Sequence, residues 1–222
     1  MAALAAIFDL DGTLLDTLGD LTAAVNYALG ELSCPRRTRE EVRSFIGNGV
    51  PTLLRRSLPA GADEEMHRQA MALFSAYYGE NMTKTTAPYP GIPWLLERLS
   101  EDGVRLGVVS NKKHDATQPL CRRFFGALLG CALGARDDSE RKPNPSMLLR
   151  AIELLGTDEA HTVYIGDSDE DIPTAQAAGI PCCPVGWGYR TAAFLRENGA
   201  KEVFETPEAL YNRLTALFAQ RG

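Results

Sequence analysis

Residues 4–15 read LAAIFDLDGTLL, and the character of this segment changes abruptly halfway along. Its first half is a short, continuous apolar run, typical of a strand that is covered on both faces in a parallel sheet. The run ends at Asp9 and Asp11, and the next residue, Gly12, permits a turn. We therefore expect a buried first strand that carries two carboxylates at its end.

Asp9 and Asp11 are two residues apart, so on a strand their side chains point to the same side. Two neighbouring carboxylates repel each other unless a cation or a shared proton compensates. The pair therefore predicts a metal site or an acid–base site. The competing interpretation is a simple hairpin turn, since Asp-Gly is a strong turn signal.

The rest of the chain falls into two regions of different pattern. Residues 17–86 show apolar residues at helical spacing and no convincing strand, which predicts helices over 20–32, 40–46, 50–58 and 63–78. Beyond residue 87, predicted strands alternate with predicted helices. The strands are predicted over 104–109, 128–133, 162–165, 180–185 and 202–205. The helices are predicted over 92–102, 113–125, 144–155, 169–178, 191–198 and 207–219. This alternation is typical of right-handed βαβ units. We predict an α/β fold with an open, Rossmann-like parallel sheet in residues 1–16 and 87–222, and an inserted α-helical cap over 17–86.

Length and composition limit the classes of function. The 222 residues suit one large domain or one domain with a smaller one, and 45% hydrophobic with 23% charged residues is ordinary globular composition. The net charge is −6, so the chain lacks the positive charge that binding to nucleic acid or to an anionic membrane surface requires. An anionic substrate would need a local positive charge, which a metal ion can supply.

The cysteines and the N-terminal run indicate a cytoplasmic protein. The five cysteines are odd in number and show no metal-binding spacing, which favours reduced thiols. The adjacent Cys182 and Cys183 are consistent with a redox site, but two core cysteines on a buried strand are the favoured interpretation. The apolar run over residues 1–8 has no basic segment and is too short for a signal peptide or a membrane span.

In an open parallel sheet, ligands bind beyond the carboxyl ends of the strands, so residues there are candidates for chemistry. Ser110 and Asn111 follow the second core strand, where a hydroxyl and backbone amides can hold phosphate oxygens, although such a pair is also common at turns and helix starts. Lys142 lies in a loop stiffened by Pro143 and Pro145, and it is either a fixed positive charge or an ordinary exposed lysine.

Carboxylates crowd the end of the strand over residues 162–165. Asp169 and Glu170 are explained by the favourable effect of acidic residues at a helix N-terminus. That effect does not explain Asp167, which lies directly at the strand end. Carboxylate oxygens of this kind suit Mg²⁺, so a magnesium site is expected here.

Four short motifs in this order resemble those of the haloacid dehalogenase-like phosphatases. They are FDLDGTL (8–14), Ser110-Asn111, Lys142-Pro143 and GDSDED (166–171). The helical insert is similar to the small cap of one subgroup, and GNGVPTL (47–53) and GWGY (186–189) resemble its phosphoglycolate phosphatase-like group. Independent chance matches multiply, so the ordered set is much more specific than any one motif.

The resemblance implies a catalytic role for three residues. Asp9 would attack phosphorus and form an aspartyl-phosphate, and Asp11 would protonate the leaving group and later take a proton from water. Lys142 would offset charge on the phosphoryl group and orient Asp9.

The same resemblance implies the binding residues. Ser110 and the backbone amide of Asn111 would hold phosphoryl oxygens. Mg²⁺ would bind the carboxylates of Asp9 and Asp167 and the backbone carbonyl of Asp11. Asp171 would support Lys142 or a metal-bound water from a second layer.

The cap is expected to close over the substrate. Gly47, Asn48 and Gly49 are the candidate contacts to the leaving group. Arg55 and Arg56 are either contacts for a substrate carboxylate or, as the favoured interpretation, an exposed helix face.

The implied activity is hydrolysis of a small phosphorylated metabolite, with 2-phosphoglycolate as the expected substrate. The presence of Asp11 favours phosphate esters, because the family's dehalogenases and phosphonate hydrolases lack a carboxylate there. A phosphomutase similar to β-phosphoglucomutase, or another small-molecule phosphatase or pyrophosphatase, remains open. A non-catalytic phospholigand-binding protein is disfavoured by the combination of Asp9, Asp11, Lys142 and Asp167. No feature of the sequence indicates an oligomeric state.

Overall fold

The computed structural model describes residues 3–219, and the remaining ends of the predicted core, residues 1–2 and 220–222, lie outside it. The described chain divides into two compact units. One consists of the segments up to Leu15 and from Pro88 onward, and the other of Asp16–Ala87. The first unit is α/β and the second is helical, so the predicted fold class is confirmed.

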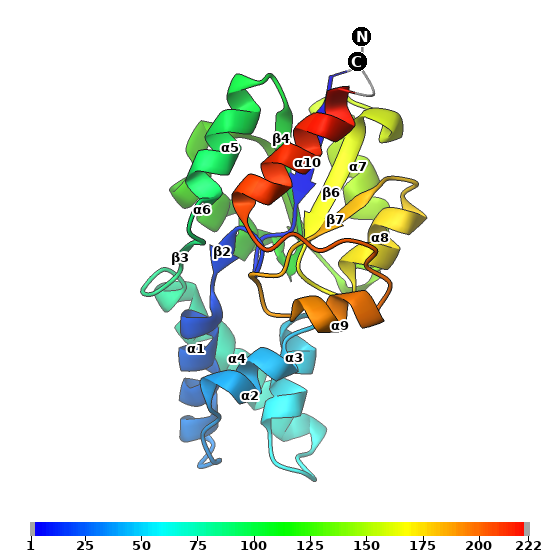
Figure 1. The fold of residues 1–222 in the computed structure, drawn as a ribbon. Helices are drawn as coiled ribbons and strands as arrows, with labels where there is room; N and C mark the ends of the chain where they lie inside the picture. The colour runs from blue at the N-terminus through cyan, green and yellow to red at the C-terminus, as the bar shows by residue number, and fades with distance from the viewer. Residues whose placement is uncertain (1–2, 220–222) are drawn as a thin grey trace. The chain divides into compact units, whose positions relative to one another are not determined.

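The α/β unit is built on a five-stranded parallel sheet in the order β5-β4-β1-β6-β7. The strands are β1 (Ala5–Phe8), β4 (Arg105–Lys113), β5 (Leu129–Ala135), β6 (Thr162–Gly166) and β7 (Cys182–Pro184). In Figure 1, β1 lies in the middle of this sheet with β4 on one side and β6 on the other. Every residue of β1 is fully buried, as the apolar run predicts.

The register of the sheet positions the site. Phe8 pairs with Val108 of β4 on one side and with Ile165 of β6 on the other. Asp9, Val109 and Gly166 therefore follow at the same level, where β1 and β6 end and β4 continues to Lys113. This carboxyl edge of the sheet is where open parallel sheets bind ligands.

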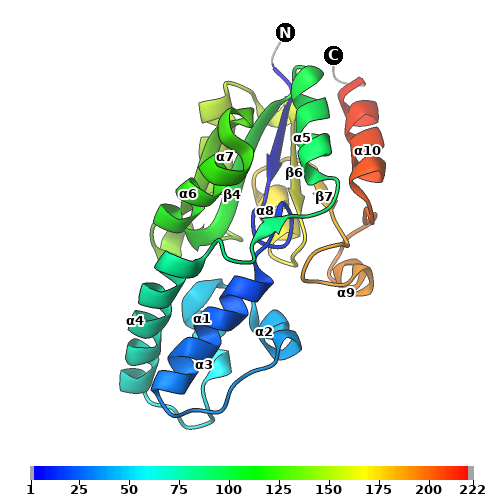
Figure 2. The same cartoon turned by 90° about the vertical axis from the view of Figure 1, so that its left-hand side faces the viewer.

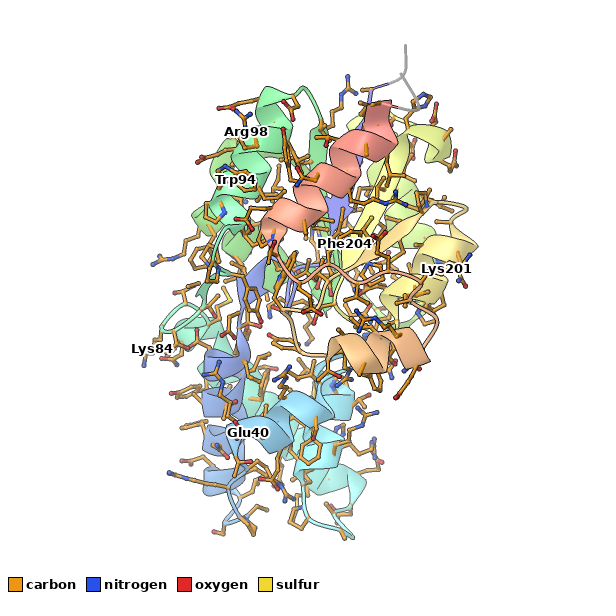
Figure 3. All side chains as sticks on the ribbon, in the orientation of Figure 1. Glu40, Lys84, Trp94, Arg98, Lys201 and Phe204 are labelled. Carbon is orange, nitrogen blue, oxygen red and sulfur yellow. The ribbon has the colours of Figure 1, made fainter. Side chains whose placement is uncertain are left out.

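Helices cover both faces of the sheet (Figure 2). They are α5 (Ile92–Glu101), α6 (His114–Phe125), α7 (Ser146–Leu155), α8 (Asp171–Ala177), α9 (Ala192–Glu197) and α10 (Pro207–Ala219), with short 3₁₀ turns at Gly126–Leu128, Asp138–Glu140 and Glu159–His161. On one face, residues of α7 and α8 share a buried cluster with Ile7 and Tyr164. On the other, α5, which carries Trp94 (labelled in Figure 3), packs against α10. The ring of Trp94 meets that of Tyr211 edge to face, with ring centroids 5.5 Å apart.

The helical unit contains α1 (Leu18–Glu31), α2 (Arg39–Phe45), α3 (Gly49–Ser57) and α4 (Glu64–Asn81). Its two ends are tied together by the buried Asp20 near the start of α1. This carboxylate accepts hydrogen bonds of 2.7–3.1 Å from the backbone amides and hydroxyls of Thr85 and Thr86, which follow α4. Short strands β2 (Leu15–Asp16) and β3 (Ala87–Pro88), which the sequence analysis did not predict, form a separate two-stranded sheet.

Several predicted elements need correction. The strand predicted over 202–205 is wrong, because only Phe204 forms a bridge, to Val185, beyond the end of β7 (Phe204 is labelled in Figure 3). β7 ends at Pro184, whose nitrogen cannot donate a hydrogen bond, so the pairing does not extend. The strand predicted over 104–109 continues to Lys113 and includes Ser110 and Asn111.

The structure bears on two expectations from the sequence, those about the cysteines and about membrane-spanning segments. All five cysteines are free thiols; Cys183 is buried on β7 and Cys182 packs against the core from a partly buried position. Among the helices of residues 3–219, none is long and apolar enough to cross a membrane.

Candidate active site

Three aspartates meet at the carboxyl edge of the sheet. Asp9 follows β1, Asp167 follows β6 and Asp171 begins α8. Each offers a carboxylate oxygen within 4.8 Å of the others, and all three side chains are buried. Such a cluster can hold a metal ion through hard oxygen ligands.

Lys142 is the cation within this cluster. Its Nζ lies 3.0 Å from Oδ2 of Asp9, 2.7 Å from Oδ1 of Asp171 and 3.2 Å from the hydroxyl of Tyr164. Burial alone would lower the pKa of Lys142, but the charges of Asp171 and Asp9 hold this pKa well above its usual value. Lys142 is therefore a buried group whose charged form is favoured, and not an exposed lysine at a helix start.

One ammonium does not balance three buried carboxylates. Burial raises the pKa of Asp9 to about 7, although the charge of Lys142 opposes the change. Burial, together with the charges of Asp9 and Asp171, raises the pKa of Asp167 to about 8. An additional cation would remove this excess of negative charge, so the donor set fits a divalent metal ion that prefers oxygen.

The loop that contains Gly188 holds the carboxylate of Asp167. Its Oδ2 accepts a 2.7 Å hydrogen bond from the amide of Tyr189, and its Oδ1 accepts one of 2.9 Å from the hydroxyl of Thr13. A Cβ on Gly188 would lie 2.2 Å from the carbonyl oxygen of Gly12, and one on Gly12 would lie 2.3 Å from Oδ2 of Asp167. Both glycines are needed because backbone and carboxylate approach so closely.

Asp11 has a different partner from Asp9. Its carboxylate lies outside the cluster of three and pairs with Lys112, whose Nζ is 2.9 Å from Oδ2 and 3.2 Å from Oδ1. The two aspartates of the first motif therefore each have their own ammonium group, Lys142 for Asp9 and Lys112 for Asp11.

Ser110 and Asn111 lie within β4. Ser110 is buried, and its hydroxyl accepts a 3.3 Å hydrogen bond from the amide of Lys112. The side chain of Asn111 accepts from the amide of Lys142 at 2.7 Å and donates to Glu170 at 2.8 Å. This side chain therefore fixes the loop that carries Lys142, a contact that the sequence analysis missed.

The predicted cap residues all belong to the helical unit. Gly47 and Asn48 lie between α2 and α3, and Gly49 begins α3. All three residues have positive φ, at 134°, 56° and 79°. Both arginines are exposed and bonded within the unit: Arg55 pairs with Glu64 at 2.6 Å, and Arg56 donates to the carbonyl of Phe45 at 3.0 Å.

Lys112 and Tyr164 are the site residues that the sequence analysis did not find. One signal was available for Lys112, because it lies two residues after Ser110 and side chains two apart on a strand share a face. For Tyr164, the signal was a phenol in the middle of a buried strand, since a buried tyrosine hydroxyl usually finds a hydrogen-bond partner.

The fold and this site define a class of protein, and comparison with known proteins agrees. The chain belongs to the haloacid dehalogenase-like hydrolases, whose family model matches residues 6–185. It is similar to the phosphoglycolate phosphatase of Pseudomonas putida, with 34% identity over 217 residues that cover 95% of this chain and 77% of the relative. The Haemophilus influenzae enzyme of the same name is 34% identical over 206 residues, covering 89% and 92%.

Solved structures agree with these sequence relatives. The structure of a candidate phosphoglycolate phosphatase from Lactobacillus delbrueckii subsp. bulgaricus superimposes with a TM-score of 0.89 at 33% identity, covering 96% of this chain and 99% of that one. The predicted family is therefore confirmed, and the buried aspartate cluster is typical of the metal site in this family.

Proposed function

We propose that this protein is a magnesium-dependent phosphate monoester hydrolase that works through an aspartyl-phosphate on Asp9. The observation that carries the proposal is the buried carboxylate of Asp9 at the sheet edge, 3.0 Å from Lys142 and clustered with Asp167 and Asp171. A carboxylate that is desolvated and held in one orientation can act as a nucleophile toward phosphorus.

Asp9, Asp167 and the backbone carbonyl of Asp11 are the proposed ligands for Mg²⁺. Asp171 belongs to the same cluster and also contacts Lys142 at 2.7 Å, which supports its role in orienting that lysine. When bound, the cation supplies positive charge that reduces the repulsion between these carboxylates and the substrate phosphate.

Two proton transfers accompany the proposed chemistry. A carboxylate oxygen of Asp9 forms a bond to phosphorus as the bond from phosphorus to the leaving oxygen breaks, and Asp11 gives that oxygen a proton. Water then attacks the aspartyl-phosphate, Asp11 takes up its proton, and inorganic phosphate leaves with Asp9 restored. Lys142, the hydroxyl of Ser110 and the amide of Asn111 are proposed to hold the phosphoryl oxygens.

The proposed substrate is 2-phosphoglycolate, a small phosphorylated metabolite. Support comes from the relatives, which bear the name phosphoglycolate phosphatase at 34% identity. We further propose that the helical unit acts as the cap and that Gly47, Asn48 and Gly49 meet the leaving group. A cytoplasmic location fits the five free thiols.

Phosphate release from 2-phosphoglycolate and from a panel of other phosphate esters, with Mg²⁺ present, tests the proposal. We expect the highest kcat/KM for 2-phosphoglycolate and no turnover by Asp9→Asn, which keeps the shape of the side chain but not its nucleophilic oxygen. Asp169→Asn is the matched control, because Asp169 faces Arg190 at 3.4 Å and is not assigned a catalytic role.

Two results would contradict the proposal. Turnover by Asp9→Asn above a few per cent of the wild-type rate, in a preparation free of contaminating phosphatase, would exclude Asp9 as the nucleophile. Conversion of a sugar phosphate into its isomer with a trace of the bisphosphate, without phosphate release, would identify a phosphomutase instead.

A further inference from the structure

Lys112 is a buried lysine that the proposed chemistry does not use. Its side chain is only 5% exposed, and its Nζ contacts both carboxylate oxygens of Asp11, at 2.9 and 3.2 Å. Lysine is rarely buried unless it is paired, because removing an ammonium from water is costly. Contact with both oxygens restricts the rotation of the Asp11 carboxylate more than a single contact would.

The backbone around Lys112 is shaped to bring this side chain to the site. β4 continues past Ser110, and its pairing with β5 shifts register between Ser110 and Lys113. Gly134 of β5 allows a close approach, since a Cβ there would lie 2.5 Å from the carbonyl oxygen of Lys112. The hydroxyl of Thr117 also lies near that carbonyl, at 3.4 Å. The position of Lys112 is therefore set by β4, β5 and α6 together.

We propose that Lys112 is a positioning residue that holds the carboxylate of Asp11 in the orientation required for proton transfer to the leaving group. This inference rests on the proposed hydrolase function. Proton transfer requires heavy atoms about 2.6–3.2 Å apart, so a carboxylate that rotates freely spends less time in a productive geometry. Lys112 acts through Asp11, while Lys142 acts on Asp9 and the phosphoryl group.

Lys112→Met tests the proposal, because methionine fills a similar volume without the ammonium group. We expect kcat/KM for an alkyl phosphate such as 2-phosphoglycolate to fall about 100-fold, the size of loss that a misplaced catalytic group can cause. The fall for p-nitrophenyl phosphate should be less than about tenfold, since its leaving group departs without a proton. Lys113→Met, at the exposed neighbouring lysine, should behave like the wild type.

A double-variant comparison separates positioning from direct substrate contact. If Lys112 acts through Asp11, adding Lys112→Met to Asp11→Asn should cause little further loss in kcat/KM. Losses that multiply in the double variant, or equal losses on both substrates, would overturn the proposal. If Lys112→Met does not fold, Lys112→Arg keeps the charge and changes the geometry, and the same comparison between the two substrates applies to it.

A crystal structure of Lys112→Met makes the test independent of turnover. The carboxylate of Asp11 should adopt another rotamer or become disordered, and an unchanged carboxylate would overturn the proposal. If the wild type hydrolyses none of the phosphate esters, the proposed function fails by that result alone, and the structure of the variant still decides whether Lys112 positions Asp11.

Discussion

The hydroxyl of Tyr164 lies 3.0 Å from Oδ1 of Asp171, the same oxygen that contacts Lys142 at 2.7 Å. This hydroxyl also lies 3.2 Å from the carbonyl of Val109 and accepts a 3.2 Å hydrogen bond from Lys142. Burial and the charge of Asp171 raise the pKa of Tyr164 well above its usual value, so the phenol stays protonated and acts as a donor. Tyr164 therefore supports the Lys142–Asp171 ion pair from within the core.

Tyr164→Phe removes this hydroxyl and keeps the ring that packs in the core. Asp171 and Lys142 each lose a buried hydrogen-bond partner, so we expect the free energy of unfolding to fall by about 1–3 kcal/mol. We also expect kcat to fall while KM changes little, because Tyr164 acts on Lys142 and not on the leaving group. Chemical denaturation and steady-state kinetics measure the two effects.

Tyr211→Phe is the matched control for Tyr164→Phe. Its phenol is on the partly exposed α10 and donates to Asp102 at 2.7 Å, in a hydrogen bond that lies at the surface. Surface substitutions usually change stability by less than about 0.5 kcal/mol, and kcat should be unaffected. Equal effects of the two substitutions on stability and on kcat would contradict the supporting role of Tyr164.

Mg²⁺ should bind more tightly as the pH rises. The folded-state pKa values of Asp9 and Asp167, about 7 and about 8, lie above those of unfolded carboxylates. Between pH ~4 and these two pKa values, the folded protein without metal holds protons on Asp9 and Asp167 that the unfolded chain has released. The contribution of these two groups to the free energy of unfolding therefore falls as the pH rises through this range. At pH ~6 both groups largely hold protons that Mg²⁺ must displace, so we expect the Kd to be at least about tenfold weaker than at pH ~8.5. The rise in Tm on adding Mg²⁺ after EDTA treatment should be correspondingly larger at the higher pH.

Asp167→Asn removes one proposed ligand and one of the clustered charges. Its Tm should respond much less to Mg²⁺ than that of the wild type, and activity should need more Mg²⁺ or be lost. A stabilisation by Mg²⁺ that is the same at both pH values, or the same in this variant, would exclude the cluster as the binding site.

The elements that position the site could be predicted because each one has a local pattern. The apolar run before Asp9 predicts a buried strand, and β1 is fully buried in the middle of the sheet. Carboxyl ends of neighbouring parallel strands meet at one edge, so Asp9 and Asp167 could be placed together although they are 158 positions apart in the sequence. The spacing of apolar residues does not reveal which oppositely charged side chain pairs with each charged residue of the site.

Lys112 shows why those partners were missed. In the sequence it is one of two adjacent lysines after an apolar strand, which usually indicates an exposed strand end. Its burial depends on the register shift against β5 and on Gly134, both of which are tertiary features. The strand predicted over 202–205 fails for a related reason. The pattern of these residues does not reveal that the segment lies beside β7, where the nitrogen of Pro184 cannot donate a hydrogen bond.

Asn48 lies in the left-handed region, with φ of 56°, and this conformation determines which substitution tests its role in specificity. Alanine would add backbone strain, whereas glycine removes the side chain and accepts this conformation. Ser33→Gly is the matched control, since Ser33 has the same φ of 56° in the same helical unit. Both substitutions change the flexibility of the unfolded chain in a similar way.

Asn48→Gly should lower kcat/KM for 2-phosphoglycolate by about 1–3 kcal/mol of transition-state binding, the cost of leaving a polar group of the substrate without its partner. Hydrolysis of p-nitrophenyl phosphate should change much less, because its aromatic leaving group does not offer the same polar contact. Ser33→Gly should leave both activities at the wild-type level. Steady-state kinetics of the three proteins on both esters measures the difference. An equal loss on the two esters would mean that Asn48 supports the fold or the shared phosphoryl chemistry, and the loop around it would no longer be a candidate for substrate discrimination.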